Sequence, residues 1–306
     1  MKLYAISDLH LRHEVNRKAL QAIRPHLEDW LIVAGDVGET VEQLDFALRT
    51  LSARFRQVIW VPGNHDLWTM PEGPESLRGE ARYRQLVELC RSRGVLTPED
   101  PYAVWPGEGP KRVIVPMFLL YDYSFRPEHV SAERVLAWCQ EEDVMCTDEY
   151  FLHPDPYPSR EAWCQARLEE TRARLEAIPS EYGTVLVNHF PLRYEHVRLP
   201  RIPRFSPWCG TRQTEDWHVR YRAEVVVTGH LHMPATLWAD GVRFEEVSLG
   251  YPQQWKHRGG LEGCLREILP EPGMESTRGS TEQGRRPGGL DGGRGLCGVV
   301  DMVGVG

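Results

Sequence analysis

The sequence lacks the features that mark secreted, membrane-spanning or zinc-stabilised proteins. Its 306 residues include seven cysteines, an odd number, and no two of them form a Cys-x-x-Cys pair. This pattern argues against a disulfide framework and against a structural zinc site. No apolar run approaches the roughly 18 residues of a membrane span, and the first residues, MKLYAISDLH, have no apolar signal-peptide core. We therefore expect a cytoplasmic protein with no membrane partner.

The sequence also lacks an excess of positive charge. The formal net charge is -8, from 36 Lys and Arg residues against 44 Asp and Glu residues. Proteins that bind nucleic acids usually present a basic surface to the phosphate backbone. We therefore expect no nucleic-acid partner. The composition, 41% hydrophobic and 26% charged, is that of an ordinary globular protein.

What the sequence does contain is a series of short apolar runs rich in β-branched residues, which are typical of strands buried on both faces. These runs lie at 2–6, 30–34, 57–61, 112–116, 184–188 and 224–228. Helical patterns lie between the early runs, at 16–27, 40–51 and 82–93. This alternation predicts an α/β fold with helices on both faces. The pair Asp240-Gly241 further predicts a turn between two antiparallel strands after residue 228.

Two segments interrupt this alternation, and a third ends it. Residues 117–180 are rich in aromatic and acidic side chains, and residues 193–222 are rich in arginine, proline and tryptophan. We expect both to be cap-like insertions in one domain that covers residues 1–267. Residues 268–306 are rich in glycine, proline and polar residues, which bury too little apolar surface to offset the entropy of ordering. We expect this segment to be a disordered tail with no catalytic role.

Polar side chains follow five of the predicted strands at the point where each strand ends. They are Asp8 and His10, then Asp36, then Asn64, His65 and Asp66, then His189, and finally His230 and His232. In α/β sheets, ligands bind outside the carboxyl ends of the strands, so we expect these side chains to converge on one crevice. Residues i and i+2 of an extended segment point the same way. Asp8 and His10 can therefore hold one ion together, and His230 and His232 can do likewise.

The kinds of side chain in this set indicate which metals they would hold. A mixture of oxygen ligands and imidazoles suits Mn, Fe or Zn better than calcium or magnesium. Seven potential ligands are too many for one such ion and suit two, with one carboxylate bridging them. Two ions about 3.5–4 Å apart clamp the attacking and leaving oxygens of a phosphoryl displacement. The set therefore predicts a dinuclear site that hydrolyses a phosphate ester.

The motifs D-x-H, G-D, G-N-H-D, a lone histidine and G-H-x-H, in this order, resemble those of the calcineurin-like metallophosphoesterases. The resemblance covers residue 1 to about residue 250 and implies a mixed β-sheet sandwich flanked by α-helices, in four αββα layers. It implies a ligand set of Asp8, His10 and His232 for one ion, Asn64, His189 and His230 for the other, and a bridging Asp36. It also implies a metal-bridging hydroxide as the nucleophile. His65 would protonate the leaving group, and Asp66 would orient His65.

An arginine-rich segment directly follows the predicted ligand His189. Arginine recognises phosphate and carboxylate groups through bidentate contacts, although most arginine runs are simply solvated loops. We predict a substrate-binding rim made of Arg193, His196, Arg198, Arg201 and Arg204, together with the Asn64 amide. His218, which flanks the segment, is a further candidate for lining the pocket.

Residues 208–218 and 247–255 also resemble one subgroup, the actinobacterial phosphopantetheinyl hydrolases. This resemblance implies a phosphodiesterase that removes the 4'-phosphopantetheine arm from acyl carrier protein, an acidic partner that the arginines would suit. The alternatives are a phosphomonoesterase of the serine/threonine or small-molecule type, a non-catalytic metal-binding scaffold, and a metallo-nuclease. The complete ligand set counts against the scaffold, and the acidic net charge counts against the nuclease.

Overall fold

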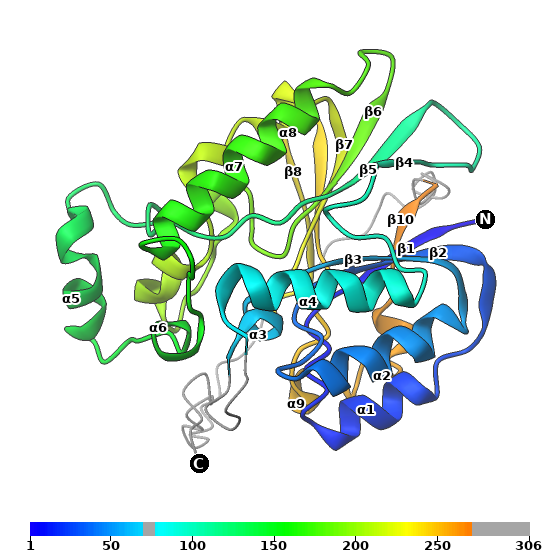
Figure 1. Ribbon diagram of the computed structural model, residues 1–306, viewed down its shortest axis with the longest axis horizontal. Helices are drawn as coiled ribbons and strands as arrows, with labels where there is room; N and C mark the ends of the chain where they lie inside the picture. The colour runs from blue at the N-terminus through cyan, green and yellow to red at the C-terminus, as the bar shows by residue number, and fades with distance from the viewer. Residues whose placement is uncertain (70–76, 271–306) are drawn as a thin grey trace, which may run out of the picture.

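Two β-sheets packed face to face form the centre of the protein, in a computed structural model that describes residues 1–69 and 77–270 (Figure 1). The strands are β1 Leu3–Ile6, β2 His26–Ala34, β3 Phe55–Val61, β4 Ala103–Val104, β5 Arg112–Pro116, β6 Gly183–Val187, β7 Ala223–Thr228, β8 Ala235–Ala239, β9 Val242–Glu246 and β10 Arg266–Leu269. One sheet has the order β10-β1-β2-β3 and the other β4-β5-β6-β7-β9-β8. Strands β1 to β3 are parallel, as are β5, β6, β7 and β9, whereas β10, β4 and β8 are antiparallel to their neighbours.

Helices cover the outer face of each sheet. The helices are α1 Glu14–Gln21, α2 Val41–Ser52, α3 Asn64–Leu67, α4 Gly79–Ser92, α5 Val135–Gln140, α6 Asp148–Phe151, α7 Arg160–Glu176, α8 Trp217–Arg220 and α9 Pro252–Trp255. Short 3-10 turns lie at Ala132–Arg134, Tyr194–His196, Pro203–Trp208, Arg212–Thr214 and Glu262–Cys264. In Figure 1, α1, α2 and α4 lie along the first sheet, and α7 and α8 lie along the second. The four αββα layers expected from the family resemblance are confirmed.

Strand β2 illustrates why these runs are apolar throughout. Leu31 and Val33 pack into the core on the helix side of the sheet. Ile32 and Ala34, which point the opposite way, pack into the core between the two sheets. Both faces of the strand therefore exclude water, and each apolar side chain contributes buried area that stabilises the fold.

The six strands predicted from apolar runs are all present, and the turn at Asp240-Gly241 joins β8 to β9 as predicted. The helix predicted over 16–27 was wrong at its end, because α1 stops at Gln21 and β2 begins at His26. Pro25 accounts for the difference, since proline disfavours helical geometry in the residue before it. The predicted helices at 40–51 and 82–93 correspond to α2 and α4.

The predicted tail starts too early. Ile268 and Leu269 belong to β10, which pairs with β1, and both side chains are buried. Their apolar character was outweighed in the sequence by the glycine and proline residues that follow. The rest of that segment, residues 271–306, lies outside the described residues, so its predicted disorder is not tested.

The structure also describes the cysteines and the helices on which the disulfide and membrane expectations depend. The six cysteines in the described ranges are all unpaired, and the seventh, Cys297, lies beyond them. None of the helices in residues 1–69 and 77–270 is both long and apolar enough to cross a membrane.

Candidate metal centre and active site

The seven predicted metal ligands lie together at the carboxyl ends of β1, β2, β3, β6 and β7. Six of these side chains are buried, and His232 is partly buried. Their ligand atoms form two groups in which all atoms lie within 4.8 Å of one another, Asp8, His10 and His232 in one and Asp36, His189 and His230 in the other. A third such group joins His10, Asp36 and His65. Asp36 therefore lies within reach of both main groups, where a bridging ligand would stand.

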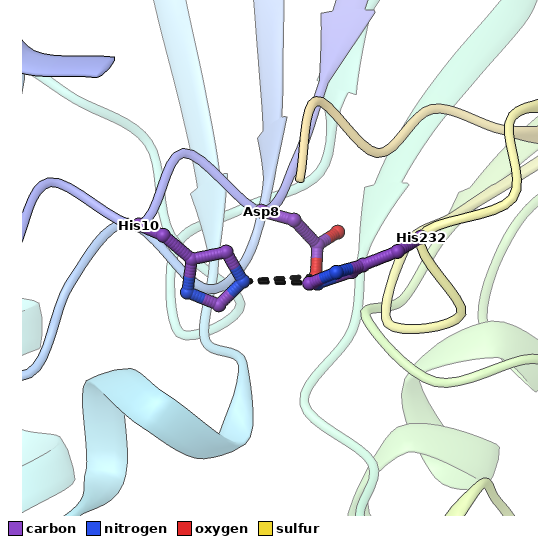
Figure 2. A group of neighbouring side chains, drawn as sticks. All are labelled: Asp8, His10 and His232. Atoms are coloured by element: carbon purple, nitrogen blue, oxygen red, sulfur yellow. Dashed lines mark hydrogen bonds and ion pairs between the residues drawn. The ribbon is translucent and has the colours of Figure 1, made fainter. Parts of the chain in front are cut away.

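In the first group, His232 lies within hydrogen-bond distance of both other side chains (Figure 2). His232 Nε2 lies 3.0 Å from Asp8 Oδ1 and 2.9 Å from His10 Nε2. Ligands about 2.1 Å from an ion and at right angles to each other lie about 3 Å apart. The spacing of these three side chains therefore fits a metal ion placed between them.

The second group contains Asp36, His189 and His230, with Asn64 beside it. His189 Nε2 lies 3.4 Å from Asp36 Oδ2 and 3.2 Å from Asn64 Oδ1. His230 Nε2 is buried and has no hydrogen-bond partner among the described residues. An unpaired buried nitrogen costs free energy unless something else satisfies it, and a metal ion would do so.

Hydrogen bonds from the protein hold the atoms of His189 and Asp8 that point away from the predicted metal positions. His189 Nδ1 lies 2.8 Å from the Ala34 carbonyl, to which it can only donate, so Nε2 keeps its lone pair for a metal. Asp8 Oδ2 accepts hydrogen bonds from Ser7 Oγ at 2.5 Å and from Ser248 Oγ at 2.7 Å. Its other oxygen, Oδ1, is the one that faces His232.

The backbone around the ligands is strained. Nine non-glycine residues in the described ranges have positive φ, and five of them are predicted ligands, namely Asp8, His10, Asp36, His230 and His232. Left-handed backbone is unfavourable for residues with a Cβ, and such strain gathers at functional sites. The expectation that Asp8 and His10 meet because their segment is extended was therefore wrong. They meet through a tight loop, held by hydrogen bonds from their N–H groups to the carbonyls of Gly35 and Asp36.

The electrostatics of the site divide the predicted histidine ligands into two that are neutral, His10 and His230, and two whose pKa is raised, His189 and His232. Burial lowers the pKa of His10 well below its ordinary value and lowers the pKa of His230 to about 3, so both imidazoles are neutral. Burial alone would oppose ionisation of Asp36, but His189 beside it holds the pKa of the carboxyl below its ordinary value. Asp36 in turn raises the pKa of His189 to about 10, against the effect of burial. A bound cation would take the place of that proton.

His65 lies at the edge of the two ligand groups. Its Nε2 is 3.9 Å from Asp36 Oδ2, its Nδ1 is 3.7 Å from Glu39 Oε1, and its ring packs at a tilt against Trp68 at a centroid distance of 3.8 Å. Although burial opposes it, Asp36 and Glu39 raise the pKa of His65. This side chain therefore lies beside the ligand groups and holds its proton more tightly than a free imidazole would, as a proton donor requires.

The prediction that Asp66 orients His65 was wrong. The Asp66 carboxylate is turned away and accepts four backbone N–H groups, from Asp36, Val37, Gly38 and Gly63, at 2.9–3.2 Å. These bonds tie the loop after β2 to the loop after β3. Asp66 therefore braces the two loops, and Glu39 is the carboxylate near His65 Nδ1.

Two arginines of the predicted rim form ion pairs with acids of the protein. Arg193 forms ion pairs with Asp240 and Glu195 at 3.0 and 2.6 Å. Arg204 pairs with Glu141 and Glu142 at 2.8 and 3.0 Å. Both arginines are therefore paired with acids of the same chain. Glu195 is close to Arg193 in the sequence, but Asp240, Glu141 and Glu142 are distant along the chain, so the sequence could not reveal those pairs.

Two of the remaining rim residues, His196 and Arg198, line a pocket. Arg198 and Arg201 are exposed and have no ion-pair partner within residues 1–69 and 77–270. Arg198 and His196 line a mostly apolar pocket of about 200 Å³. Leu231, which lies between His230 and His232, also lines it, so the pocket lies directly against a ligand loop. His218, in contrast, is buried and bonded to Asp240 and Arg193.

Several residues that contact the site escaped the sequence analysis. Ser7, Glu39 and Ser248 are small or common residues without a motif of their own. Asp148, from the segment 117–180 that we predicted to be an insertion, is fully buried and accepts a hydrogen bond from Asn64 Nδ2 at 2.9 Å. The only signal in the sequence was its place in an acidic stretch, where most carboxylates are exposed.

Comparisons with known proteins agree with this geometry. Residues 1–234 match the family described as calcineurin-like phosphoesterase. The chain is 51% identical over 272 residues to the Mycobacterium tuberculosis [acyl-carrier-protein] phosphodiesterase PptH, covering 88% of this chain and 84% of that protein. It also matches the crystal structure of phosphopantetheinyl hydrolase (PptH) from M. tuberculosis with a TM-score of 0.85 and 51% identity, covering 89% and 96% of the two chains. The chain therefore belongs to the calcineurin-like phosphoesterase family and is a metal-dependent phosphoester hydrolase.

Proposed function

We propose that this protein is a two-metal phosphodiesterase that removes the 4'-phosphopantetheine arm from acyl carrier protein. The observation that carries the two-metal part is the position of Asp36, whose carboxylate is within 4.8 Å of ligand atoms on both sides. In this proposal Asp8, His10 and His232 hold one ion. Asn64, His189 and His230 hold the other, and Asp36 bridges the two. The mixed oxygen and nitrogen set favours Mn, Fe or Zn.

Each protein group has a defined task in this proposal. Two bound ions would lower the pKa of a water molecule and neutralise charge on the phosphate. The anchored ligands keep the site rigid, so little reorganisation is needed during the reaction. His65 stands ready to donate a proton to the departing oxygen, with Glu39 beside its other nitrogen.

The choice of substrate rests on the relatives and on the surface near the site. The M. tuberculosis protein, 51% identical, is described as an acyl-carrier-protein phosphodiesterase. Exposed arginines such as Arg198 and Arg201 would attract an acidic protein partner. The pocket of about 200 Å³ beside the ligand loop could take uncharged parts of the arm. No separate observation supports the monoesterase, scaffold or nuclease alternatives. The cytoplasmic location remains a prediction from the cysteine pattern.

The first test compares an aryl phosphodiester with the matching aryl phosphomonoester, using protein reconstituted with Mn²⁺. We expect faster hydrolysis of the diester and, for holo acyl carrier protein, a mass loss equal to the phosphopantetheine arm. Asp36→Asn should lower kcat at least about 100-fold and reduce the bound metal, because it removes the charge shared between the ions. Preference for the monoester would contradict the proposal, as would full activity of the variant.

A further inference from the structure

Asp148 is the one carboxylate of the 117–180 insertion that reaches the predicted ligands. It begins helix α6, and its side chain is completely buried. A single oxygen, Oδ1, accepts two hydrogen bonds, from Asn64 Nδ2 at 2.9 Å and from Trp68 Nε1 at 2.7 Å. Oδ2 has no hydrogen-bond partner among the described residues. The defined contacts of Asp148 are therefore those of one oxygen atom.

The contact with Asn64 decides which end of that amide faces the metal site. An asparagine amide has an oxygen that can bind a metal and an NH2 group that cannot, and the two exchange when the amide rotates by 180°. Asp148 Oδ1 already accepts a hydrogen bond from the Trp68 indole N–H, which can only donate, and an accepting oxygen of this kind requires the NH2 group of Asn64 on its side. Asn64 Oδ1 then points toward His189 Nε2, at 3.2 Å, which is the orientation that ligation needs.

The contact with Trp68 acts on the other half of the site. The indole N–H can only donate, so Asp148 fixes the plane of the ring. That ring packs against His65 with centroids 3.8 Å apart and an interplanar angle of 32°. The position of the His65 ring therefore depends on the same oxygen atom that orients Asn64.

From this geometry we propose that Asp148 is a positioning residue, which sets the metal-binding orientation of Asn64 and, through Trp68, the position of His65. The inference rests on the proposed roles of Asn64 and His65. It gives the insertion a task in the reaction, because its helix α6 carries the anchor. Outer partners of metal ligands typically change metal affinity 10- to 100-fold when they are removed.

The test measures Mn²⁺ binding to metal-free protein by the electron paramagnetic resonance signal of free Mn²⁺. We expect Asp148→Ala to weaken the binding of one of the two ions about 10- to 100-fold. Asp148→Asn keeps an oxygen acceptor for both donors, so its affinity should stay within about threefold of wild type. Equal affinity of Asp148→Ala and wild type would overturn the proposal, and so would equal weakening in Asp148→Ala and Asp148→Asn.

A matched control separates positioning from general loosening of the insertion. Glu149, the next residue of α6, bonds to Tyr123, Arg160 and Trp208 and does not contact Asn64. Glu149→Gln should therefore leave Mn²⁺ affinity unchanged. A loss of affinity as large as that of Asp148→Ala would mean that the insertion acts only as structural support, which contradicts the proposal.

A second variant tests the effect on His65. Trp68→Phe removes the indole donor and leaves Asn64 bonded, so Mn²⁺ affinity should hold while kcat falls. The fall should be larger for a diester with a poor leaving group than for its nitrophenyl analogue, because only the poor leaving group needs a proton. Equal effects on both substrates would contradict this part. If wild-type protein itself binds fewer than two Mn²⁺ ions or hydrolyses neither diester, the proposed function fails and not this inference alone.

Discussion

At the scale of single residues, three of the predicted ligands have one half anchored by the protein and the other half free. Asp8 has one oxygen bonded to two serines, and His189 has one nitrogen facing a backbone carbonyl. Asn64 has its NH2 group bonded to Asp148. In each case the anchored half forces the remaining atom toward the crevice. This arrangement reduces the conformational freedom that metal binding would otherwise remove.

Residue-scale charge also yields a prediction about partner recognition. Replacing Arg198 and Arg201 together with glutamine should raise KM for holo acyl carrier protein several-fold. It should leave kcat/KM for a small aryl diester unchanged, since both side chains are exposed and free of ion pairs within the described residues. Steady-state kinetics at two salt concentrations check this, because added salt should weaken the wild type more than the variant.

Arg56, exposed at the amino end of β3, provides the matched control on the far side from the site. Its replacement with glutamine should not change KM for the carrier protein. An equal effect of Arg56→Gln would show that the response follows total charge and not the predicted rim.

At the scale of secondary-structure elements, the loops after the strands decide where the ligands point. Gly35 follows β2 with a φ of +88°. A Cβ at this position would lie 2.6 Å from His189 Nδ1 and 2.7 Å from the Gly63 nitrogen. The loop thus needs glycine both for its backbone conformation and for the close approach of β6 and β3 residues.

Gly35→Ala should therefore destabilise the protein and disturb the metal site. We expect the free energy of unfolding to fall by more than about 2 kcal/mol, since strain from positive φ and a clash with backbone add together. Mn²⁺ affinity should fall as well, because His189 must move. Urea denaturation and metal titration measure the two effects.

Gly241→Ala isolates the backbone contribution. Gly241 also has a positive φ, +77°, but nothing lies within 4 Å of the added Cβ. The Gly241→Ala variant should lose about 1–2 kcal/mol in its free energy of unfolding and keep its metal affinity. Similar results for both glycine variants would show that close packing around Gly35 contributes little.

At the scale of the whole molecule, the site exists only where the two sheets meet. Asp8, Asp36 and Asn64 follow strands of one sheet, and His189 and His230 follow strands of the other. Ligands from separate sheets come together only when the sandwich has formed. Metal binding and folding are therefore coupled.

Removal of the metals should lower thermal stability. A ligand that binds only the folded state at 100 times its Kd stabilises it by about 2.7 kcal/mol per site. We expect chelator-treated protein to unfold several degrees below the Mn²⁺-loaded form, and readdition of Mn²⁺ should restore the Tm. An unchanged Tm would mean that the ions bind weakly or bind the unfolded chain as well.

The end of the domain gives a second prediction at this scale. A chain ending at Pro270 should keep the Tm and the diesterase activity of the full chain, because the predicted tail has no catalytic role. A chain ending at Leu265 should lose several kcal/mol, since it removes β10 from the edge of β1 together with two buried side chains. Thermal unfolding of the full chain and the two shortened chains tests whether the folded domain ends near residue 265 or near residue 270. Equal Tm values for all three chains would place the end near 265.

Local patterns in the sequence were sufficient for the six strands with long apolar runs, for the gathering of the seven candidate ligands at one edge and for the family. A run such as 30–34 identifies a buried strand by itself, and the polar residues that follow each strand share one edge by the geometry of parallel sheets. The positions of Asp8, Asp36 and His189 were therefore predictable without coordinates. Short motifs succeed here because each depends on residues that are adjacent in the chain.

Only the tertiary structure decided which partners these residues have. The Asp148 carboxylate lies 84 residues from Asn64 along the chain, and Ser248 lies 240 residues from Asp8. Arg193 and Arg204 form ion pairs with acids that are distant along the chain. Asp66 turned out to bind backbone N–H groups where an interaction with His65 was expected. Such contacts depend on how distant segments pack, which local residue patterns do not encode, whereas strand periodicity and ligand chemistry are local properties of the chain.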